Sequence, residues 1–350
     1  PPADRVRPPA ADFSRNLYTN FILHAARGNC NPQFPMLYYF NRLLTFIIIF
    51  GGMDMEPQKK LLMIVNPRAG RSKPRGPLYE AAAALCDAGY LLRIRRTTAA
   101  GDAARIAAQE GGDYDTVVAV GGDGTLNEVI SGIQTLKTPP VVGYLPQGST
   151  NDFAASLEIP SDPVQAAEAI VRGQRRQLDI GRFGERIFVY VASFGAFTRT
   201  SYTASQDVKN ALGHFGYLLE SLRDLDTLRP YKVRITADGE TLDGEYLFGA
   251  VANSTSIAGM MKLEREEVIL DDGLFELLLV PHPQNAAELQ NLIWALLNQQ
   301  YNSGGLIFRH VSALHVETDE NLPWSLDGEY EPSQPTVDIT NCQRALTMLL

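Results

Sequence analysis

The sequence has few of the residues from which disulfide frameworks and zinc sites are built. Its 350 residues include three cysteines, Cys30, Cys86 and Cys342, and no C-x-x-C pair. An odd number of widely spaced cysteines supports neither kind of site and favours a reducing, cytoplasmic compartment. The five histidines lack the i, i+4 spacing of a metal-binding helix, so we interpret them as structural or surface residues.

Positive charge and long hydrophobic runs are also scarce. The formal net charge is −9, which argues against a general nucleic-acid-binding protein because phosphate contacts need a basic field. The apolar run at residues 43–50 is far shorter than the ~20 residues of a membrane-spanning helix. The remaining composition, 45% hydrophobic and 20% charged, is ordinary for a globular protein, and the length indicates roughly two domains.

Residues 1–54 differ from the rest of the chain, with arginines outnumbering acids and an apolar stretch near their end. Three interpretations are open: a non-native, possibly disordered extension, an interfacial membrane anchor, or an extra packed segment. We favour the first, because "MDMEPQKKLLMIVN" at residues 53–66 is typical of the start of a natural protein sequence.

From residue 60 onward, short apolar runs alternate with amphipathic or alanine-rich stretches. The pattern predicts strands at 61–66, 90–96, 114–120 and 140–145, and helices at 78–89, 101–112, 126–133 and 161–173. Such alternation is typical of a mostly parallel α/β sheet. Beyond a boundary near 177–181, strand-like runs dominate, at 186–194, 231–239, 245–254, 274–280 and 311–318, with helices expected only at about 205–225 and 285–300. We therefore expect a second, mainly antiparallel β domain.

Two glycine-containing turns follow predicted strands. The first, Gly121-Gly122-Asp123-Gly124, precedes a helix expected to start near Thr125, and the second, "LPQGSTNDFA", includes Gly148 and Asp152. Glycine lets an anion approach the backbone amides closely, and a helix N-terminus adds unpaired N–H groups. Because α/β proteins bind ligands at the carboxyl ends of parallel strands, the turns predict a phosphate-binding site.

The turns match neither common phosphate loop. No Gly-Lys-Ser/Thr follows, as a Walker A loop would need, and the third glycine of the dinucleotide fingerprint is missing. A carboxylate such as Asp123 repels a phosphate unless a cation lies between them. The sequence therefore predicts a Mg²⁺-bridged nucleotide.

The pair "GGDGTLNEV" and "GSTNDFA" resembles the bacterial diacylglycerol kinase and YegS/BmrU-like lipid kinase family, which is distantly related to sphingosine kinases. The resemblance covers about residues 55–350 and includes "NPRAG", "TTAAGDA", "DDGLFELLLV" and "SLDGE". It implies an ATP-binding α/β domain of residues 55–180 plus 330–350, related to NAD kinase and phosphofructokinase folds. It also implies a β-sandwich lipid-kinase domain of residues 181–329, with the site in the cleft between the two.

The resemblance also implies roles for individual residues. Glu329 would be the general base, and Asp123, Asp152 and Asp327 would form an acidic network that supports a catalytic Mg²⁺. The carbonyls of Ile269 and Leu274 and the side chain of Asp272 would hold a structural Mg²⁺, although residues 260–267 depart from the usual family sequence. The ATP-binding residues would be Asn66, Pro67, Arg68, Ala69, Gly70, Thr97, Gly121, Gly122, Asp123, Gly124, Thr125, Leu126, Asn127 and Ser149.

The activity implied is transfer of the γ-phosphate of ATP to the hydroxyl of diacylglycerol or a related lipid, by a cytoplasmic protein peripheral to the membrane. Arg172, Arg175 and Arg176, and the region of Met260 and Met261, are candidates for docking to a bilayer. Two alternatives stay open: a soluble-substrate kinase of the NAD kinase-like superfamily, and a catalytically idle nucleotide- or lipid-binding homologue. The sequence leaves both a monomer and a homodimer open.

Overall fold

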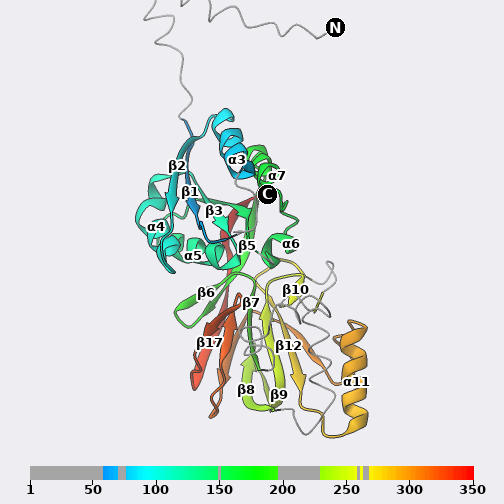
Figure 1. Ribbon diagram of the computed structural model, residues 1–350. Coiled ribbons are helices and arrows are strands. Elements are labelled where there is room, and N and C mark those ends of the chain that lie inside the picture. Colours follow the sequence, from blue (N-terminus) through cyan, green and yellow to red (C-terminus); the bar gives the residue numbers. More distant parts are fainter. Residues whose placement is uncertain (1–57, 70–75, 149–150, 196–228, 258–260, 263–267) are drawn as a thin grey trace, which may run out of the picture. The chain divides into compact units, whose positions relative to one another are not determined.

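The computed structural model divides the chain into two units, Pro1–Pro57 and Gln58–Leu350. It describes residues 58–69, 76–148, 151–195, 229–257, 261–262 and 268–350, all in the second unit (Figure 1). The predicted N-terminal extension and the helix expected at 205–225 lie outside these ranges. Within them, no helix combines the length and hydrophobicity that crossing a membrane requires.

The first part of the described chain contains a parallel sheet. Its strands are β1 (Lys60–Val65), β2 (Leu91–Arg96), β3 (Thr116–Gly121) and β4 (Val141–Pro146). They hydrogen-bond in the order β2-β1-β3-β4, all parallel. β3 is buried along its whole length, as expected for a strand covered on both faces. The four predicted strands are confirmed, with small shifts at their ends.

Helices cover both faces of this sheet (Figure 1). On one face, α4 (Asp102–Glu110) and α5 (Asp123–Ile133) share a core with alternate residues of the strands, such as Leu62 and Ile64. On the other face, α3 (Gly76–Asp87) and α7 (Pro163–Arg172) pack against the remaining strand residues, such as Leu61 and Met63. The alternation of side chains along a strand therefore divides the core between the two layers.

The ends of two helices follow from the local sequence. Asp162 is the N-cap of α7 and accepts hydrogen bonds from the amides of Val164 and Gln165, while Gly173, at φ 72°, ends the helix in a left-handed conformation. α5 begins at Asp123, with Gly122 as its N-cap, slightly before the expected start near Thr125. Asp123 and Gly124 are compatible with the first helical turn, where the amides need no intrahelical acceptor.

The second part is mainly antiparallel β structure. It comprises β5 (Arg175–Phe183), β6 (Arg186–Phe188), β7 (Val191–Gly195), β8 (Tyr231–Ala237), β9 (Glu240–Ala252), β10 (Ser256–Ile257), β11 (Met261–Lys262), β12 (Phe275–Pro281), β13 (Ile307–Val311), β14 (Ala313–Glu317), β15 (Trp324–Leu326), β16 (Glu329–Glu331) and β17 (Thr336–Leu349). The single strand predicted at 186–194 was wrong, because β6 and β7 pair with different partners, β5 and β9. The helix expected at 285–300 is confirmed as α11 (Ala286–Leu297), capped by Asn285.

The last strand links the two parts. β17 pairs with β14 and β5 in antiparallel fashion and then lies parallel to β4, with Met348 opposite Val142. The chain end therefore joins the edge of the parallel sheet, as Figure 1 shows. Because one hydrogen-bonded path runs through β17 from the antiparallel strands to β4, the two parts are connected by backbone pairing as well as by side-chain packing.

Candidate active site

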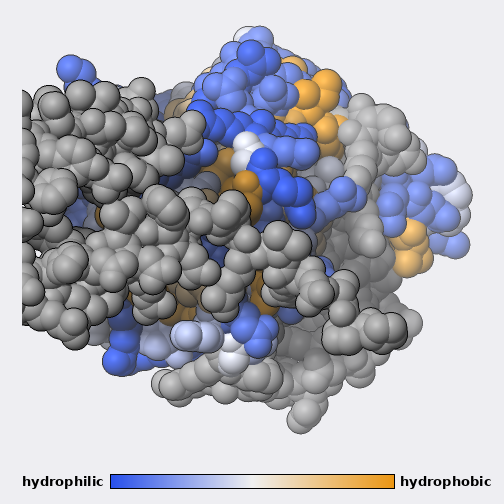
Figure 2. Space-filling model, turned by 90° about the horizontal axis from the view of Figure 1, so that it is seen from above, coloured by the Kyte–Doolittle hydropathy of each residue, from blue (hydrophilic) through white to orange (hydrophobic). Residues whose placement is uncertain are grey.

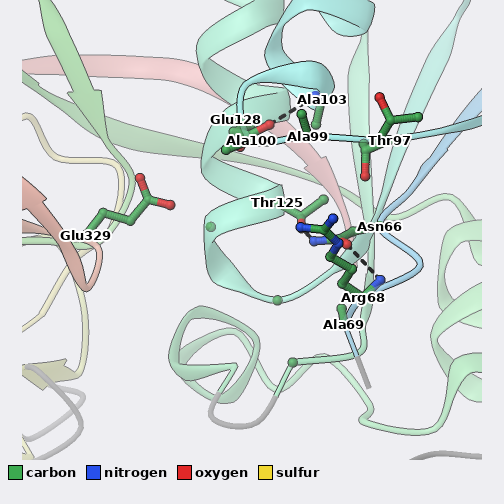
Figure 3. A pocket seen from close by; sticks show the side chains of 14 residues that line it. Asn66, Arg68, Ala69, Thr97, Ala99, Ala100, Ala103, Thr125, Glu128 and Glu329 are labelled. Carbon is green, nitrogen blue, oxygen red and sulfur yellow. Dashed lines mark hydrogen bonds between the residues drawn. The ribbon is translucent and has the colours of Figure 1, made fainter. Parts of the chain in front are cut away.

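A pocket of about 390 Å³ lies at the carboxyl ends of the parallel strands (Figure 3). Its size suits a small-molecule ligand. Residues that follow β1, β2, β3 and β4 all contribute to its wall, together with one residue of β16. The lining residues are Asn66, Arg68, Ala69, Thr97, Thr98, Ala99, Ala100, Ala103, Gly122, Gly124, Thr125, Glu128, Gly148 and Glu329.

The two glycine turns touch each other. A β-carbon at Gly148 would lie 2.7 Å from the Cα of Gly122, so neither position has room for a larger residue without moving backbone. Asn151, at φ 52°, closes the second turn: its Oδ1 accepts from the Gly148 amide at 2.9 Å, and its Nδ2 donates to the Gly148 carbonyl at 3.1 Å. The glycines that the sequence analysis singled out therefore allow the backbones of the two turns to pack closely against each other.

Asn66 organises the loop after β1. Its Nδ2 donates to the hydroxyl of Thr125 at 3.0 Å, and its Oδ1 accepts from the amide of Arg68 at 2.9 Å. The carbonyl of Asn66 accepts from the amide of Ala69, which makes a turn around Pro67. These bonds fix the loop to the first turn of α5 and bring the exposed Arg68 to the pocket, as Figure 3 shows.

The side chain of Asp123, in the first turn, reaches the residue that follows the second turn and leaves one carboxylate oxygen without a partner among the described residues. Its Oδ2 accepts from the amide of Asp152 at 3.0 Å, whereas Oδ1 is buried and has no hydrogen-bond partner among the described residues. Burial raises the pKa of Asp123 to about 6, and the charges of Asp152 and Asp327 act in the same direction. A buried carboxylate oxygen without a donor is the kind of group that binds a cation.

Asp327 is fully engaged by hydrogen bonds. Its Oδ1 accepts from the amides of Tyr190 and Val191, and its Oδ2 from the amide of Val189 and from Nδ2 of Asn127, at 2.6–3.0 Å. Burial raises the pKa of this carboxyl, and the donors oppose that shift. Because each oxygen already accepts two hydrogen bonds, Asp327 contributes charge and position to the site but no free lone pair for a metal.

Glu329 reaches the pocket from the β15–β16 hairpin. Asp327 and Gly328, both at positive φ, form the two-residue turn of this hairpin, the Asp-Gly type that hairpins favour. A β-carbon at Gly124 would lie 2.9 Å from Oε1 of Glu329, so the carboxylate stands directly against the first turn of α5. Burial, and the charges of Glu128 and Asp327, raise the pKa of Glu329, whereas Arg186, 3.7 Å from Oε2, lowers it.

The structure brings most of the predicted residues together. Asn66, Arg68, Ala69, Thr97, Gly122, Gly124, Thr125 and Glu329 line one pocket. The other predicted residues do not line it but belong to neighbouring elements, namely the loop after β1, the end of β3, α5, the start of α6 (Asp152–Ser156) and the turn between β15 and β16: Pro67, Gly121, Asp123, Asn127, Asp152 and Asp327. Leu126, 1% exposed, belongs to the hydrophobic core instead. Gly70 and Ser149 lie outside the described residues.

The predictions omitted several pocket residues. Thr98, Ala99, Ala100 and Ala103 come from the "TTAAGDA" stretch, of which the prediction named only Thr97 as a ligand-binding residue. Glu128 was also missed. Its position one helical turn after Gly124 was the available signal, because residues at i and i+4 share a helix face.

The loop proposed for a structural metal lies away from this pocket. Oδ1 of Asp272 accepts from the amide of Leu274, and the carbonyl of Leu274 accepts from Nδ2 of Asn341 at 3.1 Å. Ile269 is exposed. Nearby, Glu276 is 1% exposed with an unpartnered Oε2 among the described residues, and burial raises its pKa to about 8, with Asp272 acting in the same direction. This excess of oxygen acceptors fits a hard cation, although no three carboxylate, His or Cys side chains of the described ranges converge to hold one.

The sequence matches two protein-family models. A family model described as diacylglycerol kinase catalytic domain matches residues 60–183, and one described as YegS C-terminal NAD kinase beta sandwich-like domain matches residues 191–349. The chain is 34% identical to the diacylglycerol kinase of Bacillus subtilis (strain 168) over 275 residues, covering 78% of this chain and 90% of that one. It is 33% identical to the diacylglycerol kinase of Staphylococcus carnosus (strain TM300) over 282 residues, covering 79% and 91%.

A solved structure gives the same result. The crystal structure of a candidate diacylglycerol kinase from Bacillus anthracis (strain Sterne) matches with a TM-score of 0.71 at 25% identity and covers 85% of this chain and 97% of that one. Fold and site thus define a kinase with an α/β domain followed by a sandwich-like β domain, as predicted. The chain belongs to the diacylglycerol kinase family, which confirms the resemblance seen in its motifs.

Proposed function

We propose that this kinase transfers the γ-phosphate of ATP to the hydroxyl of diacylglycerol or a related lipid at a membrane surface. The observation that carries the proposal is the contact between Gly124 and Glu329. It brings the amides of the glycine turn and a carboxylate of raised pKa to the wall of one pocket. The diacylglycerol kinases of Bacillus subtilis and Staphylococcus carnosus support the choice of acceptor.

Different pocket residues would serve different steps of phosphoryl transfer, a reaction in which a protein mainly positions the reactants and stabilises charge. Gly122, Gly124 and Gly148 would let the phosphates approach backbone amides, and Arg68 would add positive charge. Glu329 would accept the proton of the acceptor hydroxyl, for which its raised pKa is favourable.

The donor set also fits Mg²⁺, since Asp123 Oδ1 is buried and unpartnered within the described ranges. Asp123 and Asp152 would hold the ion, and Asp327 would add negative charge behind them. When bound, Mg²⁺ would offset the negative charge of the triphosphate.

A phosphorylation assay tests the proposal against its rivals. Incubation with γ-labelled ATP and Mg²⁺ should label diacylglycerol or another lipid of an extract, and should leave NAD unlabelled. Label on NAD alone would favour the soluble-substrate alternative. Measurable ATP binding with no labelled product from any of these acceptors would favour the idle homologue.

A lipid acceptor requires the protein to meet a bilayer. Arg172, Arg175 and Arg176 are exposed, and Figure 2, seen from the α3 and α7 side of Figure 1, shows a mostly hydrophilic described surface with small hydrophobic patches. However, Arg175 pairs with Leu349, next to the start of β4. That is the amino end of the parallel sheet, whereas the pocket lies at its carboxyl ends. If the protein docked to a bilayer through these arginines, the pocket would therefore face away from the bilayer. The other candidate docking region contains Met260 and Met261, whose side chains lie outside the described residues.

Arg186→Met should shift the acid limb of the kcat/KM profile to higher pH. The guanidinium lowers the pKa of Glu329 from 3.7 Å away, so its removal raises that pKa, and a higher pH is then needed to keep the base ionised. The profile should be measured with saturating ATP for the wild type, for this variant and for Arg182→Met, an exposed control on β5. An acid limb that stays in place or moves to lower pH would contradict the assignment.

Mg²⁺ without nucleotide should raise the melting temperature by about 3 °C or more, because a ligand that binds only the folded state stabilises it. Asp272→Asn should reduce this shift, since it keeps an oxygen for the Leu274 amide but removes the charge, and Asp123 would remain available to an ion. The control is Asp271→Asn, whose carboxylate lies 3.4 Å from Arg344. Equal shifts in both variants would remove Asp272 from the proposed metal site.

A further inference from the structure

Glu128 lies on the pocket-facing side of α5, between the glycine turn and the loop after β2. It follows Gly124 by one helical turn, and both residues line the pocket. Its Oε1 accepts from the amide of Gly101 at 2.8 Å, and its Oε2 accepts from the amide of Ala103 at 3.0 Å; Figure 3 shows the carboxylate directed at this loop. Because both oxygens are occupied by amides, the side chain is suited to hold structure and poorly suited to take a proton.

These two bonds replace a missing helix cap. The N-cap of α4 is Gly101, at φ 80°, and it has no side chain with which to bond the free amides of the first turn. Glu128 supplies that acceptor from another helix, 27 residues along the chain from Gly101. The start of α4 is therefore fixed to α5, the same helix that begins with the glycine turn.

The segment held in this way forms one wall of the pocket. Thr98, Ala99 and Ala100 line it, and Asp102 ties them to α4 by accepting from the amides of Thr98 and Ala99 at 2.8 and 3.1 Å. Residues 98–100 and the start of α4 therefore form one hydrogen-bonded unit, which we call the 98–103 wall. Glu128 fixes that unit relative to Gly124 and hence relative to Glu329, which contacts Gly124.

We propose that Glu128 is a positioning residue for the nucleotide, which sets the width of the pocket by anchoring the 98–103 wall to α5. The inference rests on the proposed function, because it takes ATP as the ligand. Loss of the anchor frees the wall and weakens nucleotide binding, while the phosphate turns and Glu329 keep their places. The expected signature is a change in nucleotide affinity and KM with little change in kcat.

The test compares Glu128→Ala with Asp162→Ala. Asp162 also accepts from two amides at the start of a helix, α7, but it does not line the pocket, so its variant controls for the general effect of losing a cap. Binding of a non-hydrolysable ATP analogue is measured by calorimetry, and amide hydrogen exchange is followed at Gly101 and Ala103. For Glu128→Ala we expect a Kd raised about tenfold or more, kcat within roughly threefold of the wild type, and faster exchange at both amides. Asp162→Ala should show an unchanged Kd.

The outcomes separate this inference from the proposed function. Equal analogue affinity in the wild type and Glu128→Ala, or a loss of kcat at unchanged affinity, would overturn the positioning role while leaving the kinase assignment intact. A wild-type protein that binds no ATP analogue would refute the proposed function and this inference with it. Should Glu128→Ala fail to melt cooperatively, Glu128→Gln, which keeps one acceptor oxygen, takes its place and should give an intermediate Kd.

Discussion

Glu329→Gln should reduce turnover by roughly 10²- to 10⁴-fold, the range typical of losing a general base. The amide has nearly the same shape as the carboxylate but cannot accept a proton from the acceptor hydroxyl. Affinity for ATP should stay close to normal, because the glycine turns and Asn66 hold their places without Glu329. The variant should also lose the contribution of Glu329 to the acid limb of the kcat/KM profile, which the raised pKa of this carboxyl moves to higher pH.

The matched control for this variant is Glu185→Gln, an exposed acid in the turn between β5 and β6. It changes charge by the same amount and leaves the pocket untouched, so its turnover should equal that of the wild type. Single-turnover kinetics with labelled ATP would separate chemistry from product release. Wild-type turnover in Glu329→Gln would remove this residue from the mechanism and leave the proton without an acceptor in the described pocket.

Asp123→Asn should lower kcat/KM by roughly 10²-fold or more, because metal stabilisation of transition-state charge contributes several kcal/mol and each 1.4 kcal/mol is about tenfold. Asparagine keeps an oxygen for the Asp152 amide, which now donates to Oδ2 at 3.0 Å, so the contact between the two turns should survive. The substitution removes the carboxylate charge at Oδ1, which has no hydrogen-bond partner in the described part of the chain. The Mg²⁺ concentration that gives half-maximal activity should rise as well.

Two further variants test whether the loss of activity in Asp123→Asn is caused by the loss of the carboxylate charge. Asp123→Ala removes the hydrogen bond as well as the charge, and should therefore lower the melting temperature, whereas Asp123→Asn should not. Asp113→Asn, an exposed acid after α4, should leave activity and Mg²⁺ dependence unchanged. An Asp123→Asn variant with wild-type Mg²⁺ dependence would place the metal elsewhere.

The local sequence determined those strands and helix ends that depend only on residues close to them in the chain. The apolar runs predicted the parallel strands, and Asp162 and Gly173 predicted the ends of α7, because a cap is satisfied within one helical turn. The glycine turn was also visible, since three glycines among four residues are needed only where backbone must come close to something else. The structure supplied its protein neighbours, Gly148 on one side and Glu329 on the other.

Strands that pair with distant partners were harder to predict. β17 was not predicted as a strand, because its register shifts between Cys342 and Leu346, and Arg344 adopts a positive φ of 51°. The irregularity breaks the two-residue period by which a strand is recognised. α5 begins slightly before its expected start for a related reason, since glycine and aspartate are weak helix formers in general and suit only the first turn.

The motifs therefore indicated the kinase family and the phosphate turns, and the resemblance that they carry implied the candidate base, because a motif depends on residue type at a fixed local spacing. Only the tertiary structure decided the surroundings of the acids: one oxygen of Asp123 has no hydrogen-bond partner among the described residues, Asp327 accepts from four donors, and Glu128 caps another helix. The physical reason is that a carboxylate's role depends on which donors surround it. These donors come from segments up to 200 residues away in the chain.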